Sequence, residues 1–299
     1  MVGGPGVTFA PHAGAHGAAS PDHADPERSD AVLALENVGV RFGGINALAG
    51  VSLTVAEGAV CGLIGPNGAG KTTLFDVISG VRTPNEGRVW FRGENITHVS
   101  AVARARRGLR RTFQRVQTFG WLSVEDNVLA ALEWHGGGGG MLADIARFPT
   151  RRARERARRE RVGQVLEQCG LTAVRADPVG SLPIGLARMV ELARAIVDDP
   201  KLLLLDEPTS GLDEREAERL VEQLQLLRSS ATCAVILVEH DMGFVMEQCD
   251  TIAVLELGKV LATGAPKAIQ ENPLVRAAYL GEGSSHRKQG NIDIQGGQS

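Results

Sequence analysis

The sequence predicts an α/β domain built around a mainly parallel sheet. Two observations carry this prediction: apolar runs of strand length recur along the chain, and stretches of helical character separate them. A third is a glycine-rich segment that directly follows one of these runs and leads into a helix-compatible stretch. At 299 residues the chain is long enough for one large domain or two modest ones, and we find no internal repeat.

Three strands are expected in the first part of the chain. Residues 32–42 alternate enough in polarity to form a strand, and residues 51–55 form another. The run 59–64 is apolar and bounded by glycine, which is typical of a buried central strand. The glycine-rich residues 65–73 follow it and open a helix that we expect to reach the neighbourhood of Gly80.

The second half repeats the alternation. Residues 101–161 are rich in arginine and helical in character, with the glycine run 136–140 as a break between helices. Eight arginines lie between 147 and 161, for which a solvated helix face is the prediction and a phosphate-binding or lipid-facing patch is the alternative. Further buried strands are expected at 201–208, 232–240 and 251–258.

Composition excludes several classes of protein. The net charge of −3 argues against a globally basic nucleic-acid binder, and aromatic residues at 4% are too few for base-stacking platforms. We therefore expect no nucleic-acid partner. The four cysteines are widely spaced, which suits reduced structural thiols better than a zinc site or a disulfide framework. They are Cys61, Cys169, Cys233 and Cys249.

No part of the sequence is a candidate for crossing a membrane. No apolar run approaches the roughly 20 residues of a membrane-spanning helix. The N-terminus lacks the charged start and continuous apolar core of a secretory signal, and residues 1–30 and 283–299 are predicted to be disordered or polar tails. If the protein acts at a membrane, we expect it to dock onto subunits that span one.

The segment GPNGAGKTT at 65–73 meets the phosphate-binding pattern G-x-x-x-x-G-K-[ST]. Its glycines let the backbone wrap around phosphates, and the amides at the following helix N-terminus supply partial positive charge. Lys71 would reach the β- and γ-phosphates, and the Thr72 hydroxyl would bind Mg²⁺. A shuffled chain of this composition would contain about 0.007 such matches. Kinases, ATPases and GTPases share the motif, but the guanine motif N-K-x-D is absent.

A pair of acids follows the apolar run at 201–208. Asp206 and Glu207 come at the carboxyl end of this expected strand, the edge at which ligands bind in open α/β sheets. Asp206 would hold Mg²⁺, and Glu207 could orient or deprotonate an attacking water. His240 directly follows the next apolar strand, from which it could approach the γ-phosphate.

Together these residues resemble the ATP-binding-cassette (ABC) family, and the likeness covers residues 31–282 in the family's order. It implies a P-loop NTPase with a RecA-like core, an antiparallel β subdomain and a helical signature subdomain at about 115–197. It also implies ATP and Mg²⁺ as ligands, with Thr72, Gln114 and Asp206 at the metal and Glu207 and His240 as the catalytic pair. Gln114 would in addition sense the transporter's membrane domain. The nucleotide-binding residues would be Phe42 stacked on adenine, Gly65, Pro66, Asn67, Gly68, Ala69, Gly70, Lys71, Thr72, Thr73 and Gln114.

The resemblance further implies a signature segment and a D-loop. The signature, which closes over a nucleotide held by a second subunit, would be Leu182, Pro183, Ile184, Gly185 and Leu186. The D-loop would be Ser210, Gly211, Leu212 and Asp213. The usual signature is L-S-G-G-Q, so the serine hydroxyl that would contact the γ-phosphate is absent here. We therefore predict that the site completed by this signature is the weaker of two in a heterodimer.

A narrower resemblance is to the ATPases of importers for branched-chain amino acids and related hydrophobic amino acids or amides. It is carried by residues 41–48, 111–114, 238–250 and 272–282 and by the helical insert around 135–160. It implies a second ABC ATPase subunit, two membrane-spanning permease subunits, an extracytoplasmic substrate-binding protein, and a peripheral location at the cytoplasmic face of the cell membrane. Urea or amide import, lipid or polysaccharide export, and a soluble non-transport ATPase remain as alternatives.

Overall fold

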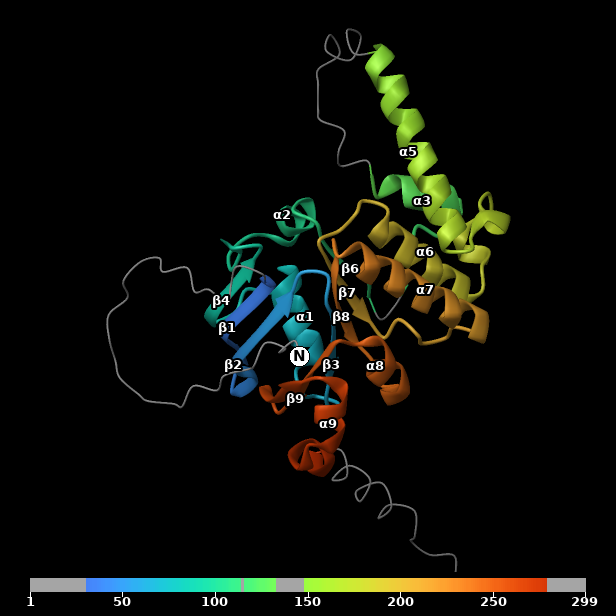
Figure 1. The fold of residues 1–299 in the computed structure, drawn as a ribbon. Helices are drawn as coiled ribbons and strands as arrows, with labels where there is room; N and C mark the ends of the chain where they lie inside the picture. Colours follow the sequence, from blue (N-terminus) through green and yellow to red (C-terminus); the bar gives the residue numbers. More distant parts are fainter. Residues whose placement is uncertain (1–30, 114–115, 133–147, 279–299) are drawn as a thin grey trace, which may run out of the picture.

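The computed structural model describes residues 31–113, 116–132 and 148–278. The expected tails at 1–30 and 283–299, the glycine run 136–140 and Gln114 lie outside these ranges. The described residues form two sheets and several helices, arranged as a sheet-containing part and a helical part (Figure 1). This agrees with the predicted α/β class.

The larger sheet has six strands in the order β10-β9-β3-β8-β7-β6. Neighbours from β9 to β6 are parallel, and β10 pairs antiparallel with β9 at the edge. The strands are β3 (Val60–Ile64), β6 (Leu109–Arg111), β7 (Leu202–Asp206), β8 (Ala234–Val238), β9 (Thr251–Glu256) and β10 (Lys259–Gly264). Strands β3, β7 and β8 are buried throughout, as their unbroken apolar runs predict.

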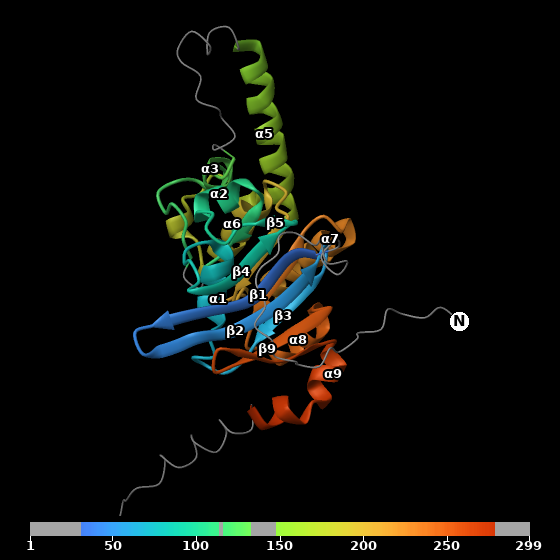
Figure 2. The same cartoon turned by 90° about the vertical axis from the view of Figure 1, so that its left-hand side faces the viewer.

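The smaller sheet is antiparallel, with the order β2-β1-β4-β5. Its strands are β1 (Ala31–Phe42), β2 (Ile45–Ala56), β4 (Glu86–Phe91) and β5 (Glu94–Asn95). Helix α1 (Lys71–Ser79) lies beside it in both views (Figures 1 and 2). Side chains of α1, of this sheet and of one face of the larger sheet share a core that includes Leu202 and Leu204.

The opposite face of the larger sheet packs on helices. Leu203 and Leu205 of β7 join a second core with side chains of the helices there, as the two-residue period of a strand requires. These helices are α3 (Val124–Ala130), α5 (Phe148–Gln168), α6 (Ile184–Ile196), α7 (Glu214–Ser230), α8 (Met242–Gln248) and α9 (Pro266–Glu271). Helix α2 (Ala101–Arg106) and the 3₁₀ turns η3 (Thr172–Val174) and η4 (Val179–Ser181) complete the described elements.

The strands expected from the sequence are present, but four others were not anticipated. These four are β4, β5, β6 and β10. Strand β2 was expected at 51–55 but begins earlier, at Ile45. The prediction that 101–161 is helical is wrong at Leu109–Arg111, which forms β6. A three-residue strand is too short to show a period, and it exists because its backbone pairs with β7.

All four cysteines are buried and unpaired, as expected from their spacing. Burial raises the pKa of the Cys61 thiol to about 11 and that of Cys169 to about 12. They therefore stay protonated and contribute packing rather than reactivity. No helix in the described ranges is both long and apolar enough to traverse a lipid bilayer.

Candidate functional site

The phosphate-binding loop connects β3 to α1, and two of its glycines are required by close backbone contacts. Gly65 has φ 150°, and a Cβ there would lie 2.1 Å from the carbonyl oxygen of Leu255. Gly70 has φ 107°, and its Cβ would lie 2.6 Å from the carbonyl oxygen of Ala47. Only glycine fits both the conformation and the space.

Helix α1 begins at Lys71, and no side chain caps its first amides. The helix N-terminus therefore presents amides and the positive end of the helix dipole to the loop. The Lys71 ammonium donates to the carbonyl oxygens of Gly65 and Pro66 at 2.5 and 3.0 Å. Positive charge thus gathers within the loop, where an anion would lie.

The acid pair lies at the carboxyl end of β7, beside the end of β8. Asp206 is opposite Val238 in the parallel register, and the Glu207 amide donates to the Val238 carbonyl oxygen at 2.9 Å. Glu207 has φ 49°, a left-handed backbone that non-glycine residues seldom adopt. This sharp turn carries the Glu207 side chain to His240, whose Nε2 lies 3.1 Å from Glu207 Oε1.

Asp206 is nearly buried, and Arg111 lies beside it. Arg111 Nη2 is 3.6 Å from Asp206 Oδ2, while Arg111 Nη1 donates to Asp76 Oδ1 of α1 at 2.6 Å. Burial raises the pKa of Asp206, and the nearby Arg111 charge opposes that rise. The arginine thus links the two carboxylates of α1 and β7 at the start of the segment that leads to Gln114.

A cavity of about 330 Å³ brings the loop, the acid pair and the histidine together. Hydroxyl, carboxylate and ammonium groups converge here, a donor set suited to phosphate and to a hard cation such as Mg²⁺. Ten of the predicted site residues line it, together with Ala47 and Val238. These ten are Asn67, Gly68, Ala69, Gly70, Lys71, Thr72, Thr73, Asp206, Glu207 and His240.

Phe42, the expected adenine-stacking residue, ends β1 and does not line this cavity. Its side chain is 43% exposed, and the guanidinium carbon of Arg82 lies 4.2 Å from the ring centroid. One ring face thus carries a cation–π contact. No motif in the sequence predicts that Arg82 packs on Phe42.

The signature and D-loop segments lie next to each other, and none of their residues lines the cavity, although the Ser210 amide donates to the Glu207 carbonyl oxygen at 3.2 Å. Pro183 is the N-cap of α6, and no side chain caps the first amides of this helix. A Cβ on Gly211 would lie 3.3 Å from Ile184 Cγ2. A Cβ on Gly185 would lie 1.8 Å from Glu216 Oε2.

That glutamate belongs to a capping box at the start of α7. The Asp213 side chain accepts from the Glu216 amide, and the Glu216 side chain accepts from the Asp213 amide, both at 2.8 Å. The carboxylate that accepts from the last D-loop residue therefore also lies close against the signature glycine. The sequence shows both segments but not this contact between them.

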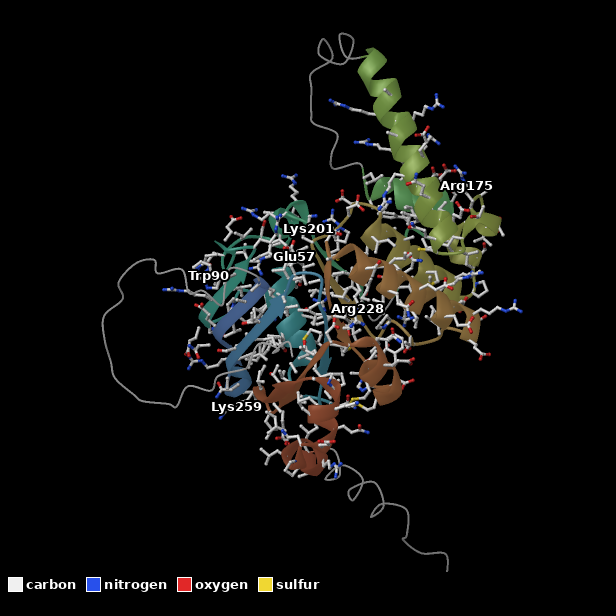
Figure 3. All side chains as sticks on the ribbon, in the orientation of Figure 1. Glu57, Trp90, Arg175, Lys201, Arg228 and Lys259 are labelled. Atoms are coloured by element: carbon white, nitrogen blue, oxygen red, sulfur yellow. The ribbon has the colours of Figure 1, made fainter. Side chains whose placement is uncertain are left out.

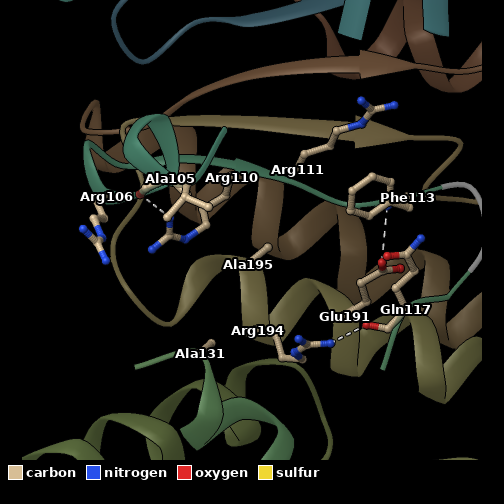
Figure 4. Close-up of a pocket in the computed structure, with 11 residues that line it drawn as sticks. Ala105, Arg106, Arg110, Arg111, Phe113, Gln117, Ala131, Glu191, Arg194 and Ala195 are labelled. Carbon is tan, nitrogen blue, oxygen red and sulfur yellow. Dashed lines mark hydrogen bonds between the residues drawn. The ribbon is translucent and has the colours of Figure 1, made fainter. Parts of the chain in front are cut away.

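A second cavity, of about 420 Å³, lies between α2, β6 and α6 (Figure 4). The Phe113 amide donates to Glu191 Oε1 at 3.3 Å, and Arg194 donates to the Gln117 carbonyl oxygen at 2.5 Å. Burial raises the pKa of Glu191 and lowers that of Arg194. Phe113 and Gln117 flank Gln114 in sequence, so this cavity borders the segment that the resemblance implicates in partner contact.

Comparison with known families gives two matches. The family described as "ABC transporter" matches residues 48–210, and the family described as "Branched-chain amino acid ATP-binding cassette transporter" matches residues 259–284. The first match spans the loop, the acid pair and the signature. The second lies in the C-terminal part, from β10 onward.

Curated relatives match nearly the whole cassette. The high-affinity branched-chain amino acid transport ATP-binding protein BraF of Pseudomonas aeruginosa is 39% identical, over 84% of this chain and 98% of its own length. LivG of Escherichia coli K12, which has the same description, is 35% identical over 85% and 99%. The lipopolysaccharide export ATP-binding protein LptB of Acidithiobacillus ferridurans is 36% identical over 78% and 89%.

Solved structures agree with the fold. A nucleotide-free ATP-binding cassette from an ABC transporter superposes with a TM-score of 0.71 at 29% identity, covering 83% of this chain and 98% of its own. An ATP-binding cassette in its ADP conformation gives the same TM-score and identity, covering 84% and 99%.

Proposed function

This chain belongs to the ABC transporter family, and from that premise we propose that it is the ATP-hydrolysing subunit of an importer for branched-chain amino acids. The observation that carries the proposal is the cavity in which Lys71, Asp206, Glu207 and His240 converge. The family match at 259–284 and the relatives BraF and LivG support the class of solute.

The phosphates of ATP would lie in the loop at the α1 N-terminus. Backbone amides and the Lys71 ammonium supply the positive charge there, and the ammonium is held by the carbonyl oxygens of Gly65 and Pro66. Thr72 and Asp206 fit a Mg²⁺ ion, with Gln114 as a further ligand implied by the resemblance. When bound, Mg²⁺ would neutralise charge on the β- and γ-phosphates.

Glu207 and His240 would manage the attacking water. Their 3.1 Å contact leaves the carboxylate 21% exposed at the cavity. The carboxylate can accept a proton from water, and His240 holds its orientation. Phosphoryl transfer in this chemistry depends on positioning and electrostatics.

We expect the working unit to contain a second ABC ATPase subunit. The α6 N-terminus with residues 182–186, and the D-loop 210–213, lie outside the chain's own cavity. They are therefore available to face a nucleotide held by the other subunit. Pro183 and Leu186 weaken that face, which favours a heterodimer in which the partner supplies a stronger signature.

The second cavity supports contact with the membrane-spanning permease subunits. It is lined by apolar groups and by arginines, and the nearby Phe119 and Trp121 are 40% and 79% exposed. Exposed aromatic side chains beside a cavity are typical of protein interfaces. Closure of the two ATPase subunits would push on the permeases here, from the cytoplasmic face, while an extracytoplasmic binding protein delivers the solute.

Substitution of Glu207 tests the assignment of the base. In the transporter assembled with its companion subunits, Glu207→Gln should bind ATP and slow hydrolysis at least about 100-fold, because general-base catalysis contributes on that scale. The matched control is Glu218→Gln on the exposed face of α7, which should hydrolyse ATP normally. Hydrolysis by Glu207→Gln at the wild-type rate would contradict the assignment.

The class of transporter is tested by uptake. Cells lacking this subunit should lose uptake of labelled leucine, isoleucine and valine, and copurification should recover permeases and a binding protein. The match to LptB keeps export of lipopolysaccharide as the second candidate. Unchanged amino-acid uptake, with an envelope lipid defect instead, would favour that candidate.

A further inference from the structure

Residues 153–160 of α5, the free half of this helix, extend beyond the rest of the described molecule. Figures 1 and 2 both show α5 projecting past the other helices, and Arg159 lies 3.8 Å from Glu125 of α3. From Val162 onward the helix buries Val162, Val165 and Leu166 in the helical core. No side chain between residues 153 and 160 is buried. The whole helix has 21 residues and is about 31 Å long at 1.5 Å per residue.

This free half stabilises itself. It consists of arginine, alanine and glutamate, which are strong helix formers. Arg156 pairs with Glu160, and Arg159 pairs with Glu155, each at 3.0 Å one helical turn apart. Because alanines are its only apolar side chains between 153 and 160, it offers no apolar stripe for another helix to bury. A partner that binds this segment must therefore recognise its charged side chains.

The charge of α5 is opposite to that of the chain. Residues 153–160 hold four arginines and two glutamates, a net charge of +2, and the whole helix carries +4, whereas the whole chain carries −3. Arg154 is exposed, and the Arg156 side chain is 83% exposed even though it pairs with Glu160. Figure 3 shows long side chains with terminal nitrogens standing out along this half. The arginines of residues 153–160 are Arg154, Arg156, Arg158 and Arg159.

The direction of α5 places this charge on the side proposed for the permeases. Helix α5 packs on α3 and α6, and α6 lines the second cavity. Both views show α2, α3 and the free half of α5 at one end of the molecule, with α9 at the opposite end. With permeases seated on that cavity, the free half points toward the cytoplasmic surface of the bilayer.

We propose that the free half of α5, residues 153–160, binds anionic phospholipid headgroups of the cytoplasmic leaflet. The inference rests on the proposed function for its orientation. Arginine guanidinium groups bind phosphate oxygens in pairs of hydrogen bonds, and an anionic leaflet attracts basic segments over about one Debye length. Because the segment has no apolar face, the contact is electrostatic and stays at the headgroup level.

Vesicle sedimentation with the full-length chain tests the proposal without permeases. The vesicles contain either phosphatidylcholine alone or one-third phosphatidylglycerol in phosphatidylcholine. Binding should occur only with phosphatidylglycerol and should disappear at about 0.5 M salt. Arg154→Gln/Arg156→Gln should lower the partition coefficient more than tenfold, at roughly fivefold for each arginine. Arg154→Lys/Arg156→Lys should retain binding.

Arg88→Gln/Arg92→Gln is the matched control, because it removes two exposed arginines from β4 and the turn that follows. This control should bind as the wild type does. The proposal is overturned by absence of binding, by equal binding to phosphatidylcholine, by wild-type binding of the Arg154/Arg156 glutamine variant, or by tighter binding to a DNA duplex than to vesicles. Uptake and ATP hydrolysis by the assembled transporter are measured separately, so vesicle binding can fail while the proposed function stands.

Discussion

At the residue scale, the groups proposed for chemistry are held in costly surroundings. Asp206 is an acid buried at the end of β7, and Glu207 adopts a left-handed backbone conformation. Lys71 is 8% exposed and donates to backbone carbonyls of its own loop. Such arrangements cost folding free energy, and they are characteristic of sites that bind a charged ligand.

Asp206 allows this cost to be measured. Burial raises the pKa of Asp206 in the folded protein above its unfolded value of about 4. The buried carboxylate therefore does not destabilise the fold below a pH of about 4, where it is protonated in both states. The destabilisation appears as the pH rises through the folded pKa and the group ionises. At neutral pH, Asp206→Asn should therefore raise the melting temperature of the nucleotide-free protein by roughly 2–4 °C, as about 1 kcal/mol does in a domain of this size. Differential scanning fluorimetry measures the change.

The difference in melting temperature between Asp206→Asn and the wild type should become smaller as the pH falls toward about 4. Asp177→Asn, at an exposed position, is the control and should leave the melting temperature unchanged. A lower melting temperature for Asp206→Asn would mean that attraction to Arg111 outweighs burial. The same variant should lose the dependence of nucleotide binding on Mg²⁺.

The sequence predicts residues of this site unevenly. Lys71, Thr72, Asp206 and Glu207 are predictable because each belongs to a contiguous motif whose spacing depends on local backbone geometry. Arg111 gives no such signal for its role, because its partners Asp76 and Asp206 lie on α1 and β7. The same holds for Arg82 over Phe42.

At the scale of elements, the proposed contact with a nucleotide held by a second subunit depends on the start of α6. The helix begins with Pro183 as its N-cap, and its first amides have no side-chain cap. Ile184, which follows, is 56% exposed. An anion could approach these amides, but no hydroxyl accompanies them at 183 and no amide side chain at 186.

Restoring those groups tests the weaker-site hypothesis. Pro183→Ser/Leu186→Gln should raise ATP turnover of the assembled transporter by about tenfold, since a hydrogen bond to a charged group contributes about 1.5–3 kcal/mol. Steady-state phosphate release measures it. Pro183→Ala/Leu186→Met, which adds no hydrogen-bonding group, serves as the control. Equal turnover in wild type and the Ser/Gln variant would refute the hypothesis.

The sequence predicted helices and strands correctly where a run of apolar residues is long and uninterrupted. The buried strands β3, β7 and β8 were predictable because parallel strands covered on both faces are apolar throughout. Strand β6 was not, because three residues show no period and the strand depends on pairing with β7. Strand β5 has two residues and depends in the same way on β4.

At the scale of the whole molecule, the candidate site is built where elements from the two cores meet. The loop leads into α1 in the core shared by the two sheets, while the acid pair and His240 follow strands β7 and β8, which contribute to both cores. A ligand that bridges the loop and the acid pair must therefore stabilise the folded protein as a whole.

Thermal unfolding tests this linkage. MgADP at about 100 times its dissociation constant should add roughly 2.7 kcal/mol and raise the melting temperature by about 5–10 °C. Lys71→Ala should show little rise, because its loop has lost the ammonium that faces the phosphates. If MgADP at saturating concentration left the wild-type melting temperature unchanged, the cavity would not be a nucleotide site.

What the sequence determined by itself is the chemistry that lies within short stretches of chain: the glycine-rich loop with Lys71, the acids after a buried strand, and the parallel sheet that these strands form. What only the tertiary structure decided is which distant groups meet. It brought His240 to Glu207 and Arg111 to Asp206, placed Gly185 close against Glu216, and left the signature outside the chain's own cavity. The physical reason is that local patterns depend on backbone geometry over a few residues, whereas these contacts depend on how separate strands and helices pack against one another.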